Sequence, residues 1–269
     1  MRGNAAIRAG ALVLAIIIVF SAAAPLLAPD DPFSLDLAEG LAPTAWGHPF
    51  GQDKLGRDIA SRVFYGGRIS LMVGFAAVFF SVLIGGAVGA VAGYAGGAWD
   101  EFLMRVTDVF MAFPGILLAI ALMSVLEPRV GNVVLSLSAF GWVGYARLVR
   151  AQVLSLRERE YVVAARAGGA RPLRVIVRHI LSNVISPVIV EASFGMAGAI
   201  VAEAGLSFLG LGVQPPDPSW GAMLAEGRDF LLIAPHLTLF PGIALALTVM
   251  SLNILGDGLR DLLDPAQKR

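Results

Sequence analysis

A run of 31 consecutive residues, 69–99, contains no charged side chain. A helix needs about 20 apolar residues to cross the hydrocarbon core of a bilayer, so this run is longer than one crossing requires. Charged residues make up 15% of the chain, whereas in soluble domains they make up about 25%. The sequence therefore predicts an all-α membrane protein that crosses the bilayer repeatedly.

Six segments have the composition of membrane spans. They are residues 9–27, 69–99, 109–126, 130–146, 180–202 and 230–256. The first can also be interpreted as a cleaved signal peptide, because Ala22-Ala23-Ala24 has the small side chains of a cleavage site. The run exceeds the apolar core of about 7–15 residues in such peptides, which favours a retained anchor. We predict an N-terminal unit, 1–68, made of this anchor and an external loop, and a five-helix core, 69–269.

The segments between and within the spans carry further structural signals. The proline-rich residues 28–68 predict a structured external loop with a short amphipathic helix on the bilayer surface, and residues 100–105 predict a polar turn. Pro114 and Pro241 lie inside spans, where proline bends a helix because it lacks the backbone N–H. Glycine recurs every fourth residue at 85, 89, 93 and 97. Such a stripe lets a neighbouring helix approach closely.

Glu191 lies within the fifth predicted span. A carboxylate at membrane depth is unfavourable, so it should face the interior of the helix bundle or water. Two interpretations remain open from the sequence: a polar lining of a substrate path, or a hydrogen-bonded packing residue.

The loop between the fourth and fifth spans is strongly basic. Its arginines are residues 147, 150, 157, 159, 166, 171, 174 and 178. Basic loops lie on the cytoplasmic side of membranes, and alternation of the spans then places both termini in the cytoplasm. With that orientation, fourteen of the twenty basic residues lie inside.

An arginine-rich helix is predicted over residues 157–168, within this loop. Tyr161, Ala164, Ala165 and Gly168 share one face at helical spacing, and this face is small and apolar. Gly168 and Gly169 should end the helix, and a proline at 172 suits the start of another. The loop is therefore predicted to be a docking site for a cytoplasmic protein.

These residues resemble the EAA loop of the permease subunits of ABC importers. That pattern is Glu-Ala-Ala, three residues, Gly, nine residues, then Ile-x-Leu-Pro. Ala164, Ala165 and Gly169 match it, as does the His-Ile-Leu string at 179–181. Val163 and Ser182 depart from it, standing where Glu and Pro are usual. The departure at Val163 removes the contacts that the usual glutamate would make.

Two further segments resemble the dipeptide, oligopeptide and nickel branch of that family. They are residues 50–71 and the string GLSFLGLGVQPP at 205–216, which is followed by Pro-Ser-Trp-Gly. We expect residues 203–229 to leave the membrane as a short half-buried helix and a proline-stiffened turn, with Trp220 at the membrane interface. Ser207 and Phe208 are, with Glu191, candidate residues of a substrate path.

The resemblance implies a type I ABC importer transmembrane domain with six spans and a cytoplasmic coupling helix. It implies two cytoplasmic ATPase subunits, a second homologous permease that forms a heterodimer with this chain, and an extracytoplasmic substrate-binding protein. Peptides, glutathione-like compounds and nickel chelates are the implied substrates. Within the coupling loop, 157–183, the implied ATPase contacts are Glu160, Tyr161, Ala164, Ala165, Arg166, Gly168, Gly169 and Arg171.

Several other classes of function are disfavoured. A P-loop needs a lysine that follows a glycine, but the only two lysines, Lys54 and Lys268, do not. We therefore expect ATP with Mg²⁺ to bind to partner subunits rather than to this chain. No cysteine is present, the histidines have no metal spacing, and a net charge of zero gives no attraction to nucleic acid. No catalytic pair occurs within the spans, so the chain is not expected to be an enzyme. The alternative is a secondary transporter driven by an ion gradient, with Glu191 as the candidate ion site.

Overall fold

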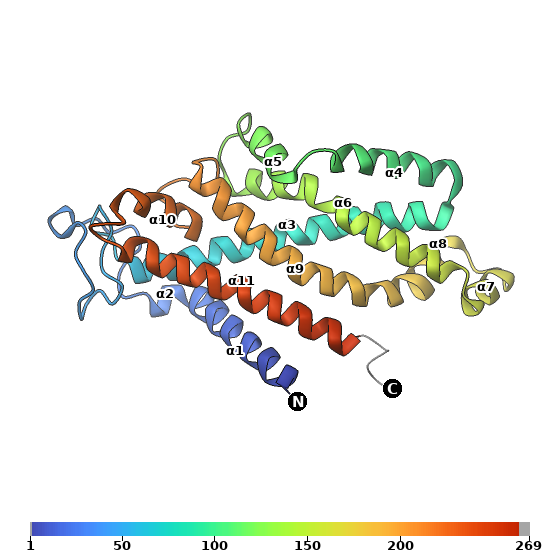
Figure 1. Ribbon diagram of the computed structural model, residues 1–269, viewed down its shortest axis with the longest axis horizontal. Helices are drawn as coiled ribbons and strands as arrows, with labels where there is room; N and C mark the ends of the chain where they lie inside the picture. The colour runs from blue at the N-terminus through green and yellow to red at the C-terminus, as the bar shows by residue number, and fades with distance from the viewer. Residues whose placement is uncertain (1, 264–269) are drawn as a thin grey trace.

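The computed structural model describes residues 2–263, and it is built from helices (Figure 1). These are α1 (Arg2–Ala22), α2 (Ala24–Leu27), α3 (Ile59–Ala95), α4 (Gly97–Met111), α5 (Gly115–Met123), α6 (Val130–Arg157), α7 (Glu160–Ala167), α8 (Pro172–Arg174), α9 (Leu181–Phe208), α10 (Trp220–Gly227) and α11 (His236–Leu263). A π-helical turn, Val175–Ile180, joins α8 to α9, and short 3-10 turns lie at Leu37–Glu39 and Arg228–Phe230. No strand occurs within the described range.

Within residues 2–263, five helical segments are long and apolar enough to cross a membrane. They are α1, α3, α6, α11 and the continuous stretch Pro172–Phe208. A sixth crossing is formed if α4 and α5 are taken together, although they meet at 78°. The break lies at Pro114, which precedes the first turn of α5. The bend predicted from this proline is therefore confirmed, and the architecture agrees with a six-span membrane protein.

The turn before α4 lies earlier than the sequence indicated. Residues 100–105 were expected to form a polar turn, but they are helical within α4. The chain turns instead at Gly96 and Gly97, whose φ angles are +66° and +55°. This left-handed conformation is accessible to glycine because it has no Cβ. Asp100 and Asp108 of α4 can then pair with arginines of α6.

The glycine stripe packs α3 against α6. A Cβ at Gly85 would lie 2.3 Å from the Trp142 carbonyl oxygen, and one at Gly89 would lie 2.3 Å from that of Ala146. A Cβ at Gly93 would meet Val153 at 2.8 Å. The close helix packing predicted for the stripe is confirmed at these three positions. Gly97 belongs to the turn instead.

Several helices extend beyond the apolar segments from which they were predicted. α3 begins at Ile59, where the Asp58 carboxylate caps it by accepting a 2.7 Å hydrogen bond from the Ser61 N–H. The expected separate amphipathic helix is therefore the first part of α3. α6 continues to Arg157 and α9 to Phe208. A charge limits which part of a helix can lie in hydrocarbon, but it does not end the helix, because backbone hydrogen bonding continues in water.

Residues 28–58 form a loop at one end of the molecule, beside α10 (Figure 1). A buried ionic cluster holds them there: Arg57 lies 2.6 Å from the Asp53 carboxylate and 2.7 Å from that of Glu226 on α10. α7 lies at the opposite end, α11 runs in its direction, and the start of α1 lies near the middle of the molecule's length. α1 packs along α11, with Ile7 against Gly258 and Gly10 against Ile254.

Candidate coupling loop and membrane cavity

The arginine-rich segment divides into two helices rather than one. α6 ends at Arg157, the chain turns at Glu158 and Arg159, and α7 then runs from Glu160 to Ala167. The predicted helix is therefore confirmed over 160–167, and only its predicted start at 157 is wrong. Arg159 has an extended backbone conformation, with φ −70° and ψ 143°, which a helix cannot contain. α6 therefore ends before it, and α7 begins after it.

Val162 attaches α7 to the rest of the protein. Its side chain is 0% exposed and packs with Val175, Ile180 and the last turns of α6. The Tyr161 hydroxyl accepts a 3.4 Å hydrogen bond from the side-chain amide of Asn183 on α9. A short helix of eight residues thereby gains a defined position at the end of the bundle.

The small face predicted on α7 is largely open to solvent. Tyr161, Ala164 and Gly168 are exposed, and Ala165 is half-buried. Gly169 has a φ of +79°, and its N–H donates to the Arg166 carbonyl at 3.0 Å, so the glycine pair ends the helix as predicted. The predicted contact residues thus lie on α7 and in the turn that follows it, with Val162 as the buried residue of α7 and the small face uncovered.

The eight arginines have two different roles. Arg150 donates two hydrogen bonds to Asp100 on α4, at 2.5 and 2.7 Å, and Arg147 pairs with Asp108 on the same helix. Arg157 donates to the Gly93 carbonyl of α3 at 2.9 Å. The other five are exposed and form no ion pair with a described residue: Arg159, Arg166, Arg171, Arg174 and Arg178. This division could not be seen in the sequence, because the acidic partners lie about 40–50 residues away along the chain.

Three of the five exposed arginines border a groove next to α7. Arg171, Arg174 and Arg178 line it together with Leu173 and Val177, whose apolar side chains are also exposed. A groove that combines arginines with exposed apolar side chains is suited to a protein surface that carries carboxylates around an apolar contact.

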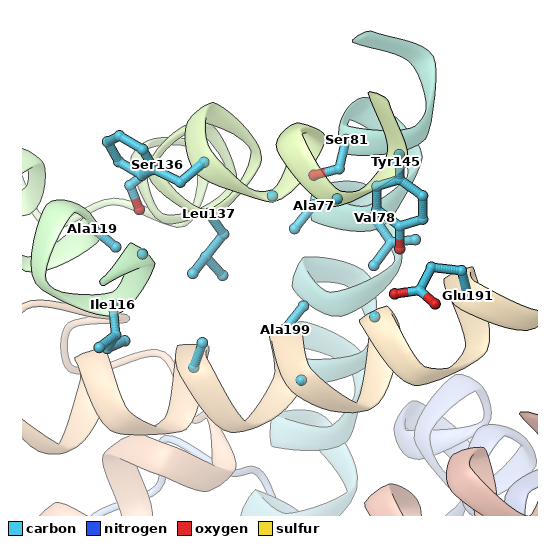
Figure 2. A pocket seen from close by; sticks show the side chains of 17 residues that line it. Ala77, Val78, Ser81, Ile116, Ala119, Ser136, Leu137, Tyr145, Glu191 and Ala199 are labelled. Carbon is cyan, nitrogen blue, oxygen red and sulfur yellow. The ribbon is translucent and has the colours of Figure 1, made fainter. Parts of the chain in front are cut away.

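A second candidate site is a cavity of about 300 Å³ among α3, α5, α6 and α9 (Figure 2). Glu191 of α9 and Tyr145 of α6 lie at one end of it, and the Tyr145 hydroxyl points toward the Glu191 carboxylate. Most other lining residues are glycine, alanine or serine, so the space is left open by small side chains. The bend at Pro114 contributes by placing α5 beside the cavity, with Ile116 and Ala119 at the other end.

The structure brings together only part of the predicted substrate path. Glu191 lines the cavity, whereas Ser207 and Phe208 lie outside it. Ser207 is buried and donates a 2.7 Å hydrogen bond to Glu203, and Phe208 packs under the guanidinium of Arg228. Tyr145 was not found from the sequence, because it lies on a different helix from Glu191 and no motif surrounds it.

Two residues expected in or near water are buried. Glu203 was placed where the chain leaves the membrane, but α9 continues past it and its side chain is 0% exposed. Trp220 was expected at the membrane interface, but it is 1% exposed and its indole N–H donates to the Val63 carbonyl at 3.0 Å. Both are covered because α10 folds back onto α3 and α9.

Within residues 2–263, no group of three or more histidine or acidic side chains is placed to hold a metal ion. The prediction that ATP and Mg²⁺ bind to partner subunits remains a prediction.

Residues 85–269 match the family of binding-protein-dependent transport system inner membrane components. This chain belongs to that family. The permease is 42% identical to the dipeptide transport system permease protein DppC of Alkalihalophilus pseudofirmus, over 96% of this chain and 85% of the relative. It is 44% identical to the glutathione transport system permease protein GsiD of Pectobacterium atrosepticum, over 100% of this chain and 89% of the relative.

The permease also shares its fold with a solved transporter. The MetNI methionine ABC transporter, in an inward-facing conformation, superposes with a TM-score of 0.58 at 17% sequence identity, covering 76% of this chain and 96% of the other. The expected fold, an ABC importer transmembrane domain, is confirmed. The permease is accordingly a multi-pass inner-membrane transport subunit rather than an enzyme.

Proposed function

We propose that the permease is the membrane-spanning subunit of an ATP-driven importer of peptides, including glutathione-like peptides. In this proposal the coupling loop, 157–183, docks on a cytoplasmic ATPase subunit. A second homologous permease completes the translocation path, a second ATPase binds that permease, and an external binding protein delivers the substrate.

The observation that carries the proposal is the uncovered face of α7. The helix is anchored by buried Val162, presents Tyr161 and Ala164 to solvent, and is accompanied by five exposed arginines. The sequence itself contains no P-loop. A rigid, uncovered basic element on a transport subunit without an ATP site is suited to transmit motion from a separate ATPase.

The substrate class is supported by the relatives. The two permeases described above are named for dipeptide and glutathione transport. Dipeptides and glutathione, which is a tripeptide, are both short peptides. Nickel chelates, which the sequence resemblance also implied, have no such support here.

Docking can be tested directly because the permease has no native cysteine. An Ala164→Cys variant should cross-link to the ATPase encoded beside it when an opposing cysteine is introduced there. Gly47→Cys, in the loop at the opposite end, is the matched control and should not cross-link. Equal cross-linking of the two variants would contradict the docking assignment.

The energy source distinguishes the proposal from a secondary transporter. Membrane vesicles that contain the permease and the proteins encoded beside it should import radiolabelled tri-alanine only with ATP and the binding protein. Import that continues without ATP under a proton or sodium gradient would favour the secondary transporter, with Glu191 as its ion site.

A further inference from the structure

Of the residues that the structure describes, Glu191 is the only one with a charged side chain that lines the cavity among α3, α5, α6 and α9. It lies near the middle of the 37-residue helical stretch Pro172–Phe208. No described residue forms an ion pair or a side-chain hydrogen bond with it. An unpaired carboxylate at membrane depth is strongly unfavourable, so a cation or water must neutralise or solvate it when the cavity is in use.

Tyr145 provides a second polar group at the same end of the cavity. Its side chain is 5% exposed, and its hydroxyl has no hydrogen-bond partner among the described residues. The hydroxyl reaches this position because Gly195 has no side chain: a Cβ there would lie 2.2 Å from it. A buried hydroxyl without a partner is unfavourable by about 1–3 kcal/mol, so a ligand that bonds with it would remove that penalty.

Among the described residues, the remaining lining has no cationic side chain that would attract an anionic partner. Ser136, at the other end of the cavity, donates its hydroxyl to the Val133 carbonyl at 2.9 Å. Around it the lining is mostly glycine and alanine, with Ile116 and Leu137 as apolar walls. The cavity of about 300 Å³ is at the lower limit for ligand pockets, which suits one end of a peptide rather than a whole long peptide.

We propose that Glu191 and Tyr145 form a site for the primary ammonium group of the substrate as it crosses the membrane. The inference rests on the proposed function and adds a chemical requirement to it. The ammonium donates to the Glu191 carboxylate and to the Tyr145 oxygen, while the small residues accommodate the first side chain. Peptides and glutathione share a primary ammonium group, so one site serves both.

The test is a Glu191→Gln variant in the complete importer, with tri-alanine as the probe. This variant loses the hydrogen bond between the substrate ammonium and a charged carboxylate, and the import rate should therefore fall at least about tenfold. Stimulation of ATP hydrolysis by the loaded binding protein should be unchanged. Glu191→Asp keeps the charge and should restore part of the import rate. Glu101→Gln removes an exposed carboxylate from the start of α4 and should import at the normal rate.

A Tyr145→Phe variant tests the second group. It should lower import less than Glu191→Gln, and the double variant should be no worse than Glu191→Gln alone, since the two groups bind one ammonium.

The other outcomes overturn the inference in recognisable ways. Normal import by Glu191→Gln would show that the carboxylate is not used by the substrate. If the second permease is lost when the Glu191→Gln importer is purified, a cationic side chain of that second permease pairs with Glu191 instead of the substrate. An equal loss of import and of ATP hydrolysis would assign Glu191 to structure or coupling. Absence of tri-alanine import by the unmodified importer would instead refute the proposed function, and the inference with it.

Discussion

The Ser70 hydroxyl on α3 donates a 3.1 Å hydrogen bond to the Glu203 carboxylate on α9, across 133 residues of sequence. Ser207 donates to the other carboxylate oxygen at 2.7 Å. The Trp220 N–H, at the start of α10, is 3.3 Å from the Ser70 hydroxyl. One buried carboxylate therefore joins α3 and α9 and, through Ser70, holds α10 at the end of the bundle that carries the loop 28–58.

Replacement of this carboxylate should destabilise the permease. Glu203→Ala leaves the buried Ser70 and Ser207 hydroxyls without their acceptor, and we expect a loss of about 1–3 kcal/mol in unfolding free energy. Thermal unfolding in detergent measures the change. Glu127→Ala, at an exposed carboxylate between α5 and α6, is the control and should have little effect. Equal shifts for both variants would contradict the role assigned to Glu203.

The packing of α3 on α6 can be tested with two neighbouring glycines. Gly89→Ala places a Cβ 2.3 Å from the Ala146 carbonyl oxygen and should destabilise the protein by about 1–3 kcal/mol, because the helices must separate. Gly86→Ala meets no atom within 4 Å and should be neutral or stabilising by up to about 1 kcal/mol. The melting temperatures of the two variants measure this difference. A Gly89→Ala variant more stable than Gly86→Ala would exclude close packing of α3 on α6 at residue 89.

Substitutions in the coupling loop should impair transport without unfolding the spans. Ala165→Glu adds a charged side chain to the small face of α7. Gly169→Leu forces a residue with a large side chain into a left-handed conformation with φ +79°, which is unfavourable for any residue with a Cβ. We expect both to reduce tri-alanine import strongly while the melting temperature of the spans is kept. Ala38→Glu, in the loop at the opposite end, serves as control. Import at the normal rate by both coupling-loop variants would show that another surface meets the ATPase.

Reporter fusions test the orientation. Both termini are predicted to be cytoplasmic, so a periplasmic phosphatase fused after Arg269 should be inactive. The same enzyme inserted after Gly47, where the loop is open, should be active. The reverse pattern would place the arginine loop outside the cell and would overturn the coupling proposal.

The apolar segments predicted most of the membrane architecture, because hydropathy and helical spacing are properties of neighbouring residues. The same reasoning anticipated the bend at Pro114, the glycine packing of α3 and the end of α7 at the glycine pair. It misplaced helix ends wherever charges began, as in α3, α6 and α9. There the helix continues into water or protein, since the backbone hydrogen bonds are unaffected by the polarity of the side chains.

The order of amino acids alone decided that the chain is a helical membrane protein without a P-loop and with a face of small residues in a basic loop. Only the tertiary structure decided which arginines pair internally, that Glu203 and Trp220 are buried, and that Tyr145 meets Glu191 at one cavity. These facts depend on contacts between helices that are distant in sequence. Such contacts are set by how whole helices pack, and no local pattern of residues contains that information.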